Sequence, residues 1–400
     1  MTLLSERNVQ NKLRFHQNLF TLALIILIIK NMTDSSGLFK KPMWLDNLMV
    51  MTFILVIGIK LFTQSYTYAR FIAFLLLWVL CAYTCITCKY YYLVYSSLTV
   101  CAMQDVDLTK TLAVTCRIKA LILAVHTSVY VWDLFFQPWL VTYSYRDNVR
   151  RMTFFMGHAN TFSMYVCWTL LEYLYSRYKK MHMIELVVVW GINTLVYAFC
   201  DSNSSMIIMT FVCLLTFFSK KLKGTAMKVY EAVITFEARY LYAFLSGFFI
   251  VLIIGYVNGL FSALFMTLSD LFTGRLLFGA IAYDLKGVSL IGKAISFPEK
   301  LYWRGHWIDS MVFDNCYIWM FVCYGVVYLI LISAVFMRLG KKMTLIDKIF
   351  IVSYALYTMM EAYVMNTGLV FPLLILGPYI MASQGKEVNR AAKKEVKRYE

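Results

Sequence analysis

The residues best suited to chemistry lie in one stretch of the second half of the chain. An arginine, Arg275, is followed by His306 and by two carboxylates, Asp309 and Asp314. A guanidinium group binds anions through paired hydrogen bonds, and a carboxylate or an imidazole can act as a general base. These residue types predict that the chain either transforms or transports an anionic substrate.

The arrangement of these side chains depends on how residues 301–317 fold. If the segment is helical, one side is formed by His306, Ser310, Asp314 and Tyr317, with Asp309 at its edge. A polar face at the mouth of a membrane span is costly in lipid and usually faces a cavity. Helix capping by Asp309 or Asp314 is the structural alternative.

A second helix is predicted from Gly274 to Lys286, with Thr273 as its cap and Gly287 at its stop position. Its many apolar residues suit a helix that lies in the membrane interface. Arg275 falls in the first turn, where a cation does not complement the helix dipole. An anion bound there would contact both the arginine and the free N–H groups.

Other polar residues lie at predicted helix ends or within apolar segments. Arg150 and Arg151 belong to a second cationic outer loop, and Glu361 and Asn366 flank a short outer turn. For both cationic loops, the alternative is that they complete helix ends near lipid phosphates. Glu172 lies inside an apolar segment, where we expect it to pair with a neighbouring helix.

The composition indicates which elements must hold these residues. Of the 400 residues, 61% are hydrophobic and only 15% are charged, whereas a soluble protein has roughly 25% charged residues. The chain is therefore predicted to be an all-α, polytopic membrane protein forming a single transmembrane domain over residues 1–400. Its net charge of +16 reflects topology and anionic lipid, and no nucleic-acid partner is expected.

About twelve apolar segments have spanning length. They are 15–31, 47–63, 69–86, 90–104, 113–134, 159–176, 183–200, 206–219, 241–268, 313–337, 345–364 and 367–383. Only Lys89 divides the third from the fourth, so ten or eleven spans with a re-entrant piece are the alternative. No small-residue cleavage site follows the first segment, which we expect to be retained.

The positive charges agree with this arrangement. With the N-terminus inside, the inner stretches hold 26 Lys and Arg residues and the outer ones 12, which accounts for all 38. This bias follows the positive-inside rule and leaves both termini in the cytoplasm. The long loop at 269–312, with short helices of its own, then lies outside, and the basic tail at 384–400 lies inside.

Several catalytic motifs are missing. The sequence has no Walker motif, HExxH, G-x-S-x-G or clustered His and Cys ligand set. A lone CxxC at Cys85–Cys88 is only a weak metal or redox signal. We therefore expect neither a metal nor another cofactor, and an ATP-driven pump or a zinc protease is disfavoured.

Four short motifs resemble those of the bacterial O-antigen and capsular polysaccharide polymerases, within the O-antigen ligase and polymerase superfamily. The first runs from Arg151 to Asn160, and the second is Thr273-Gly274-Arg275. The third is Asp314-Asn315-Cys-Tyr317 with Gly325 eight residues beyond the tyrosine, and the fourth is Glu361 followed by Asn366. The chain departs from the family after the seventh span, where Asp201-Ser-Asn-Ser-Ser205 replaces a usual Ser-Arg pair.

The resemblance implies a plasma-membrane enzyme acting on oligosaccharide repeats carried by undecaprenyl pyrophosphate at the outer face. The growing capsule, exopolysaccharide or O-antigen chain moves onto a sugar hydroxyl of the next repeat, and undecaprenyl pyrophosphate leaves. Direct displacement would invert the anomeric centre. Membrane lipid, and a flippase and a chain-length regulator of the same pathway, are the implied partners.

The resemblance also suggests a role for each residue. Arg275 and Arg151 would hold the pyrophosphate, with Arg150 as a weaker contributor. Asp314 is the favoured base, with Asp309 and His306 as alternatives. The remaining substrate-binding residues would be Asn160, Asn315, Tyr317, Glu361 and Asn366.

Two alternatives stay open at this point. A related ligase would transfer the glycan to another acceptor, and a flippase would move the lipid-linked sugar without chemistry. The sequence leaves the sugars, the linkage, the chain-length control and the oligomeric state open.

Overall fold

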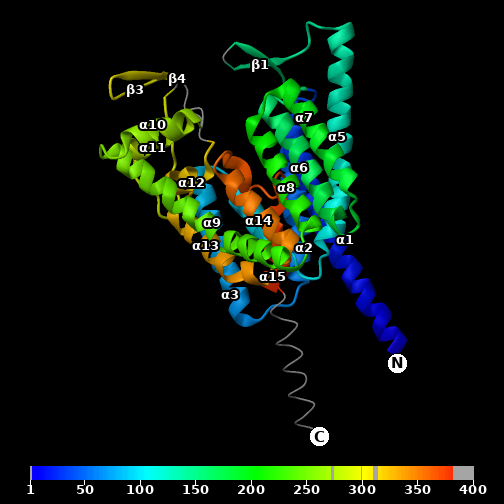
Figure 1. Cartoon of the computed structure of the whole chain (residues 1–400). Helices are drawn as coiled ribbons and strands as arrows, with labels where there is room; N and C mark the ends of the chain where they lie inside the picture. Colours follow the sequence, from blue (N-terminus) through cyan, green and yellow to red (C-terminus); the bar gives the residue numbers. More distant parts are fainter. Residues whose placement is uncertain (1, 147, 272–273, 299, 310–313, 382–400) are drawn as a thin grey trace. The chain divides into compact units, whose positions relative to one another are not determined.

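The computed structural model describes residues 2–146, 148–271, 274–298, 300–309 and 314–381. Within these residues the chain forms fifteen α-helices and two short β-hairpins (Figure 1). Seven of the helices are long and apolar enough to cross a membrane. The predicted helical architecture is therefore confirmed, and several helices fit a multi-pass membrane protein, but the predicted count of about twelve spans is not confirmed. The predicted basic tail at 384–400 lies outside the described residues.

The chain divides into two compact units. Unit 1 comprises Met1–Phe71, Leu98–Phe217 and Thr367–Glu400, and unit 2 comprises Ile72–Ser97 and Phe218–Asn366. Arg150, Arg151 and Asn160 belong to unit 1, and all the other predicted site residues belong to unit 2.

Unit 1 is a helical bundle with one β-hairpin. Its helices are α1 (Thr2–Ser35), α2 (Met43–Phe62), α5 (Leu108–Phe136), α6 (Ala159–Arg177), α7 (Met183–Cys200), most of α8 (Asn203–Lys221) and α15 (Leu376–Met381), with the 3₁₀ turns η1 (Tyr178–Lys180) and η5 (Phe371–Ile375). Strands β1 (Tyr143–Arg146) and β2 (Val149–Met152) pair in antiparallel register and follow the end of α5 (Figure 1).

Helix α6 forms the core of unit 1. It packs against α5 and α7 and buries side chains on several sides, including Phe162, Tyr165, Trp168 and Leu171. It also buries Ser163, Thr169 and Glu172, and it is not among the seven helices that are long and apolar enough to cross a membrane. Neighbouring helices, not lipid, surround this segment.

Unit 2 is built around one long helix. Its helices are most of α3 (Tyr68–Cys88), most of α4 (Tyr92–Cys101), α9 (Gly224–Val257), α10 (Ser262–Leu271), α11 (Arg275–Lys286), α12 (Cys316–Trp319), α13 (Val326–Leu339) and α14 (Leu345–Thr358). Shorter pieces are the π-helical turn η2 (Met320–Tyr324) and the 3₁₀ turns η3 (Gly340–Lys342) and η4 (Ala362–Met365). Helix α9 packs against α11, α12, α13 and α14.

The apolar segments of the second half are broken more often than their hydropathy predicts. The segment 241–268 divides into α9 and α10, and 313–337 divides at Gly325 into a short α12–η2 piece and α13. Gly325 has φ +122°, and a Cβ atom there would lie 2.3 Å from the carbonyl oxygen of Leu290. This glycine therefore allows the chain to turn while another backbone segment passes in contact with it.

Residues 301–309 do not form the helix that was considered for residues 301–317. Strands β3 (Lys300–Trp303) and β4 (His306–Asp309) form an antiparallel hairpin instead. Arg304 and Gly305 both have positive φ, as a two-residue hairpin turn requires. His306 and Asp309 consequently lie on a strand and do not share a helical face with Tyr317, and Ser310 lies outside the described residues.

The helix predicted after residue 273 is present. Helix α11 runs from Arg275 to Lys286 and ends at Gly287, which has φ +68°. Gly274, at φ +78°, occupies the N-cap position. Thr273, the predicted cap, lies outside the described residues.

Candidate functional site

In unit 2 the predicted anion-binding residue and the predicted base are in contact. Arg275 is the first residue of α11, and its Nε atom lies 3.0 Å from Oδ2 of Asp314. Its Nη1 atom donates a hydrogen bond of 2.6 Å to the carbonyl of Met360. The two paired side chains are 13% and 24% exposed, so both can still be reached from solvent. Three separate chain segments thus meet at one guanidinium group.

The side chain of Asp314 does not cap a helix. The N-cap of α12 is the next residue, Asn315, whose Oδ1 accepts the backbone N–H of Ile318 at 3.2 Å. Capping was the structural alternative for Asp314, and the cap is supplied by its neighbour.

Asn315 also carries a spare donor. Its side chain is buried, and among the described residues its Nδ2 atom has no hydrogen-bond partner. Leaving such a group unsatisfied costs about 1–3 kcal/mol. A substrate oxygen that entered beside Asp314 would satisfy it.

Tyr317 holds the site together. It is fully buried, and its hydroxyl donates to the carbonyl of Ala355 on α14 at 2.8 Å. Its ring lies at 4.9 Å from that of Tyr242 on α9, edge to face. These contacts fix α12 to its neighbours, which makes Tyr317 a positioning residue.

Glu361 and Asn366 lie at the two ends of the turn η4, at its N-cap and C-cap positions. Both side chains are buried. Glu361 directly follows Met360, the residue whose carbonyl accepts from Arg275. The fourth predicted motif therefore adjoins the Arg275–Asp314 pair through the backbone.

In unit 1, Arg151 closes the end of a helix. Its side chain is only 1% exposed. Nε donates to the carbonyl of Cys200 at 2.7 Å, and Nη2 donates to the carbonyl of Asp201 at 3.0 Å and to Oδ1 of Asn160. A cation at a helix C-terminus satisfies the last carbonyls and complements the dipole. These contacts give Arg151 and Asn160 a structural task at the end of α7.

The turn after α7 receives two arginines from the β1–β2 hairpin. Besides Arg151, Arg146 donates from Nη1 to the carbonyl of Asp201 at 3.1 Å. Residues 201–205 contain no arginine, yet Arg146 and Arg151 bring cationic groups to this turn. Sequence spacing alone could not reveal this, because it depends on the hairpin fold.

The other cationic residue of the hairpin lies over an aromatic ring. The Arg150 guanidinium carbon is 4.4 Å from the centroid of Tyr143. Nearby, the Nδ1 atom of His158 accepts the backbone N–H of Asn160 at 3.2 Å and caps α6. Partial burial and then the charges of Arg151 and Arg146 lower the pKa of His158, although part of its ring remains exposed.

Unit 1 also contains a buried ion pair. Nζ of Lys119 on α5 lies 2.6 Å from Oε1 of Glu172 on α6, and the two side chains are 1% and 2% exposed. Thr115 donates to Oε2 of Glu172 at 3.0 Å, and Lys119 also donates to the carbonyl of Leu369 at 3.4 Å. The prediction that Glu172 pairs with another helix is confirmed. Its partner, Lys119, was not identified from the sequence, because the pairing depends on how α5 and α6 pack.

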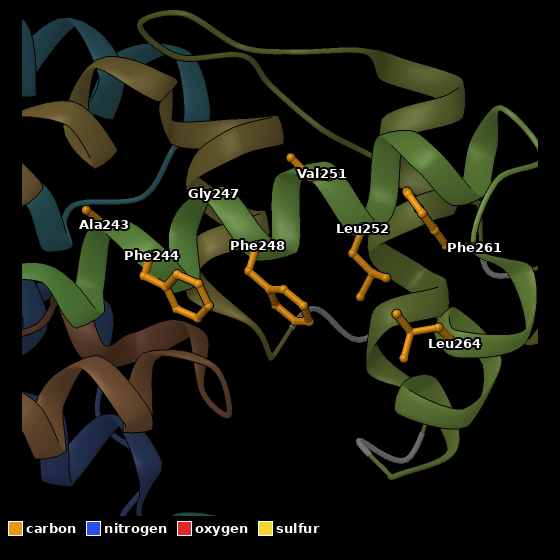
Figure 2. Close-up of a pocket in the computed structure, with 8 residues that line it drawn as sticks. All are labelled: Ala243, Phe244, Gly247, Phe248, Val251, Leu252, Phe261 and Leu264. Atoms are coloured by element: carbon orange, nitrogen blue, oxygen red, sulfur yellow. The ribbon is translucent and has the colours of Figure 1, made fainter. Parts of the chain in front are cut away.

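An apolar surface cavity of about 460 Å³, open to the outside and lined mostly by exposed side chains, lies along α9 and α10 in unit 2 (Figure 2). Its lining is Ala243, Phe244, Gly247, Phe248, Val251, Leu252, Phe261 and Leu264. Helix α10 runs on from this cavity, and the carbonyl of Ser269 near its end accepts the N–H of Gly274 at 2.7 Å. The lining of the cavity comes from α9 and α10, and Arg275 begins α11, the next helix along the chain.

No protein-family model, curated protein or solved structure matches the chain. Within the described residues, no three His, Cys, Asp or Glu side chains gather as a metal site.

Proposed function

We propose that the protein is a membrane glycosyltransferase, a polysaccharide polymerase that joins oligosaccharide repeats carried on undecaprenyl pyrophosphate. The observation that carries this proposal is the pair of Arg275 and Asp314, an anion-binding group in contact with a base. Arginine suits a pyrophosphate because its planar fork binds two oxygens and stays charged. The apolar composition supports a lipid-linked substrate.

Substrate binding would separate the pair. Arg275 and Asp314 compensate each other's charge across 3.0 Å. A pyrophosphate that takes the guanidinium releases the carboxylate, which then becomes available as a base only when the donor is bound. The spare Nδ2 donor of Asn315 is available for an oxygen of the same substrate.

The transfer step is a direct displacement. Asp314 takes the proton of the acceptor hydroxyl, whose oxygen forms a bond to the anomeric carbon of the donor chain. The bond from that carbon to the pyrophosphate oxygen breaks, and undecaprenyl pyrophosphate leaves with the electron pair. Arg275 compensates the developing negative charge, and the anomeric configuration inverts. No metal or other cofactor takes part in this scheme.

The polyprenyl tail would lie in the apolar cavity between α9 and α10 (Figure 2). Its lining has no charged side chain, and it is followed along the chain by the helix that leads to Arg275. A hydrocarbon chain held there would direct its pyrophosphate toward the start of α11. Arg151 is left out of this scheme, because its donors are used at the end of α7.

The topology belongs to the same proposal. The chain would cross a bacterial plasma membrane about twelve times, with both termini in the cytoplasm and the Arg275–Asp314 site on the outer face. The distribution of 26 inner and 12 outer basic residues supports this orientation. A flippase that supplies the lipid-linked repeats and a regulator of chain length are the proposed partners.

One observation favours a second candidate. The buried pair of Lys119 and Glu172 lies within helices of membrane-spanning length, where ionisable residues commonly mark transport pathways. A flippase of lipid-linked sugar would use such a pair. A ligase that uses the same donor but another acceptor is the closest chemical alternative.

The test uses the purified full-length protein in lipid, given a tagged undecaprenyl-pyrophosphate repeat from the native pathway. Wild type is compared with Arg275→Ala and with Arg177→Ala. Arg177 is the last residue of α6 in unit 1, and its side chain is 46% exposed. We expect a ladder of products that differ by one repeat, retained in Arg177→Ala. Loss of a transition-state donor typically costs on the order of 10²–10³ in rate, so Arg275→Ala should nearly abolish the ladder.

Each other outcome has a distinct meaning. A single transfer product formed only with a foreign acceptor would favour the ligase. Movement of the tag across the bilayer without a new glycosidic bond would favour the flippase. A ladder that Arg275→Ala leaves undiminished would keep the polymerase and remove this arginine from the site.

A further inference from the structure

Two large aromatic side chains are exposed side by side on the β3–β4 hairpin. Tyr302 and Trp307 are directly opposite each other in the strand register, with ring centroids 5.2 Å apart and planes inclined at 57°. They are 59% and 70% exposed. Together they form a continuous apolar surface on one face of the hairpin.

The hairpin is anchored through residues next to this pair. Trp303 is buried, and its Nε1 atom donates to Oδ2 of Asp284 on α11 at 2.9 Å. Arg304, in the turn, donates from Nη2 to the carbonyl of Val257, the last residue of α9, at 2.8 Å. The exposed rings are therefore presented by a fixed scaffold.

Tyrosine and tryptophan are well suited to binding on such a scaffold. Each presents a large rigid surface with only two side-chain torsions to restrict, so little conformational entropy is lost. An exposed apolar surface on a fixed element often marks an interaction site. The face is not purely apolar, because Lys300, two residues from Tyr302 on the same side of β3, is also exposed.

The position of the hairpin in the chain indicates what it contacts. Helix α11, which begins with Arg275, carries its anchor Asp284, and Asp314 follows Trp307 by seven residues. Seven residues span at most about 25 Å when fully extended. A ligand that extends from the Arg275–Asp314 site over a few sugar rings can therefore reach the aromatic pair.

We propose that Tyr302 and Trp307 form a binding surface for the oligosaccharide part of the lipid-linked substrate. The apolar C–H face of a pyranose ring stacks on the aromatic rings, while the sugar hydroxyls remain free to bond to Lys300 and to water. This inference rests on the proposed function, since it assigns the pair to a substrate of that site. The surface would hold the glycan while its reducing end lies at Arg275.

The test measures binding of the free oligosaccharide, released by mild acid from the lipid-linked pool of the producing cells. Saturation-transfer NMR or calorimetry is carried out on the full-length protein in lipid nanodiscs. Aromatic contacts of about 0.5–1.5 kcal/mol correspond to roughly twofold to tenfold in Kd. We expect a loss of that size for Trp307→Ala, a larger loss for the double variant with Tyr302→Ala, and near wild-type binding for Trp307→Phe. Trp139→Ala, which removes a tryptophan that is 77% exposed in unit 1, is the control and should bind normally.

Two results would overturn the assignment. Unchanged oligosaccharide binding in the double variant would remove the pair from the glycan site. The second result combines two measurements: brominated lipids quench the tryptophan fluorescence that Trp307→Phe removes, and the double variant binds the oligosaccharide normally. The rings would then be membrane anchors and not a glycan site.

Failure of this inference can be separated from failure of the proposed function. A double variant that still binds the sugar and still forms the product ladder would refute the aromatic surface alone. Sugar binding that depends on the pair, without any ladder from the wild type, would keep the surface and refute the polymerase.

Discussion

Nε of Arg275 lies 3.0 Å from Oδ2 of Asp314, joining the first turn of α11 to the residue before the cap of α12. Each charge is partly removed from water and compensated by the other. For a pair removed this far from water, the cost of desolvating both charges offsets much of their attraction, so the pair is weak evidence for a stabilising role. An incoming anion can still reach the pair, so we interpret it as an anion-binding site and not as a stabilising contact.

Asp314→Asn should abolish proton removal but leave donor binding intact. General-base help contributes roughly 10²–10⁴ in rate, so we expect kcat of polymerisation to fall by that factor. KM for the lipid-linked donor should stay the same or fall, because Arg275 is no longer held by a carboxylate. Initial rates over a range of donor concentrations measure both quantities.

The matched control for this variant is Asp270→Asn, a carboxylate near the end of α10 that is exposed. It should change neither parameter appreciably. If Asp314→Asn instead raised KM with kcat unchanged, Asp314 would be a binding residue and the base would have to be sought elsewhere.

Gly325→Ala should strongly destabilise unit 2. A Cβ atom at this position would lie 2.3 Å from the carbonyl oxygen of Leu290 and 2.8 Å from the backbone nitrogen of Ile291. Backbone atoms cannot move aside as a flexible side chain does, and φ +122° is itself unfavourable for alanine. We expect a clear fall in the thermal unfolding midpoint of the detergent-solubilised protein, with a loss of product ladder.

Gly58→Ala provides the comparison. Gly58 lies within α2, and a Cβ atom added there would meet nothing within 4 Å. Alanine also has a higher helix propensity than glycine by about 1 kcal/mol, so its midpoint should stay or rise. Equal midpoints for the two variants would show that the segment around Leu290 can move away from the helix break.

Length and hydropathy predict the longer helices of unit 1 (α1, α2, α5, α6, α7 and α8) well, because an uninterrupted apolar run can satisfy its backbone in lipid only as a helix. The predicted span 367–383 is different, since its described part forms the 3₁₀ turn η5 and the short helix α15. Length and hydropathy also fail around Gly325 and in the hairpin at Arg304–Gly305, where contacts between distant segments decide the backbone path. The same limit applies to the site. Arg275 and Asp314 could be selected by residue type and motif, whereas the cap at Asn315 and the anchor between Trp303 and Asp284 depend on tertiary packing.

Stability should fall with acid through His158. Partial burial and then Arg151 and Arg146 lower its pKa below the ordinary value of 6.5, so the folded protein favours the neutral ring. The unfolded chain then binds more protons below pH 6.5, and stability is lost as pH falls from there toward the folded pKa. Protonation of Nδ1 also removes the acceptor that caps α6.

His158→Asn tests this effect, because asparagine supplies a capping oxygen that does not titrate in this range. Thermal midpoints of wild type and variant are compared between pH 5 and pH 8, conditions chosen around the reference value of about 6.5. The two should agree at the alkaline end, and the wild type should fall further in acid. A difference that does not vary with pH would contradict the assignment.

The buried pair of Lys119 and Glu172 gives a test of coupling between α5 and α6. Removing one partner leaves an uncompensated buried charge, which costs about 3–5 kcal/mol. Lys119→Met and Glu172→Leu should therefore each lower the thermal midpoint substantially. The double variant Lys119→Met with Glu172→Leu should recover much of the loss, since no charge is left without a partner.

A midpoint of the double variant that falls by the sum of both single effects would show that the two residues act independently. A double variant that is stable and still forms the product ladder would assign the pair to structure, whereas a stable double variant without any ladder would make it part of the polymerisation mechanism.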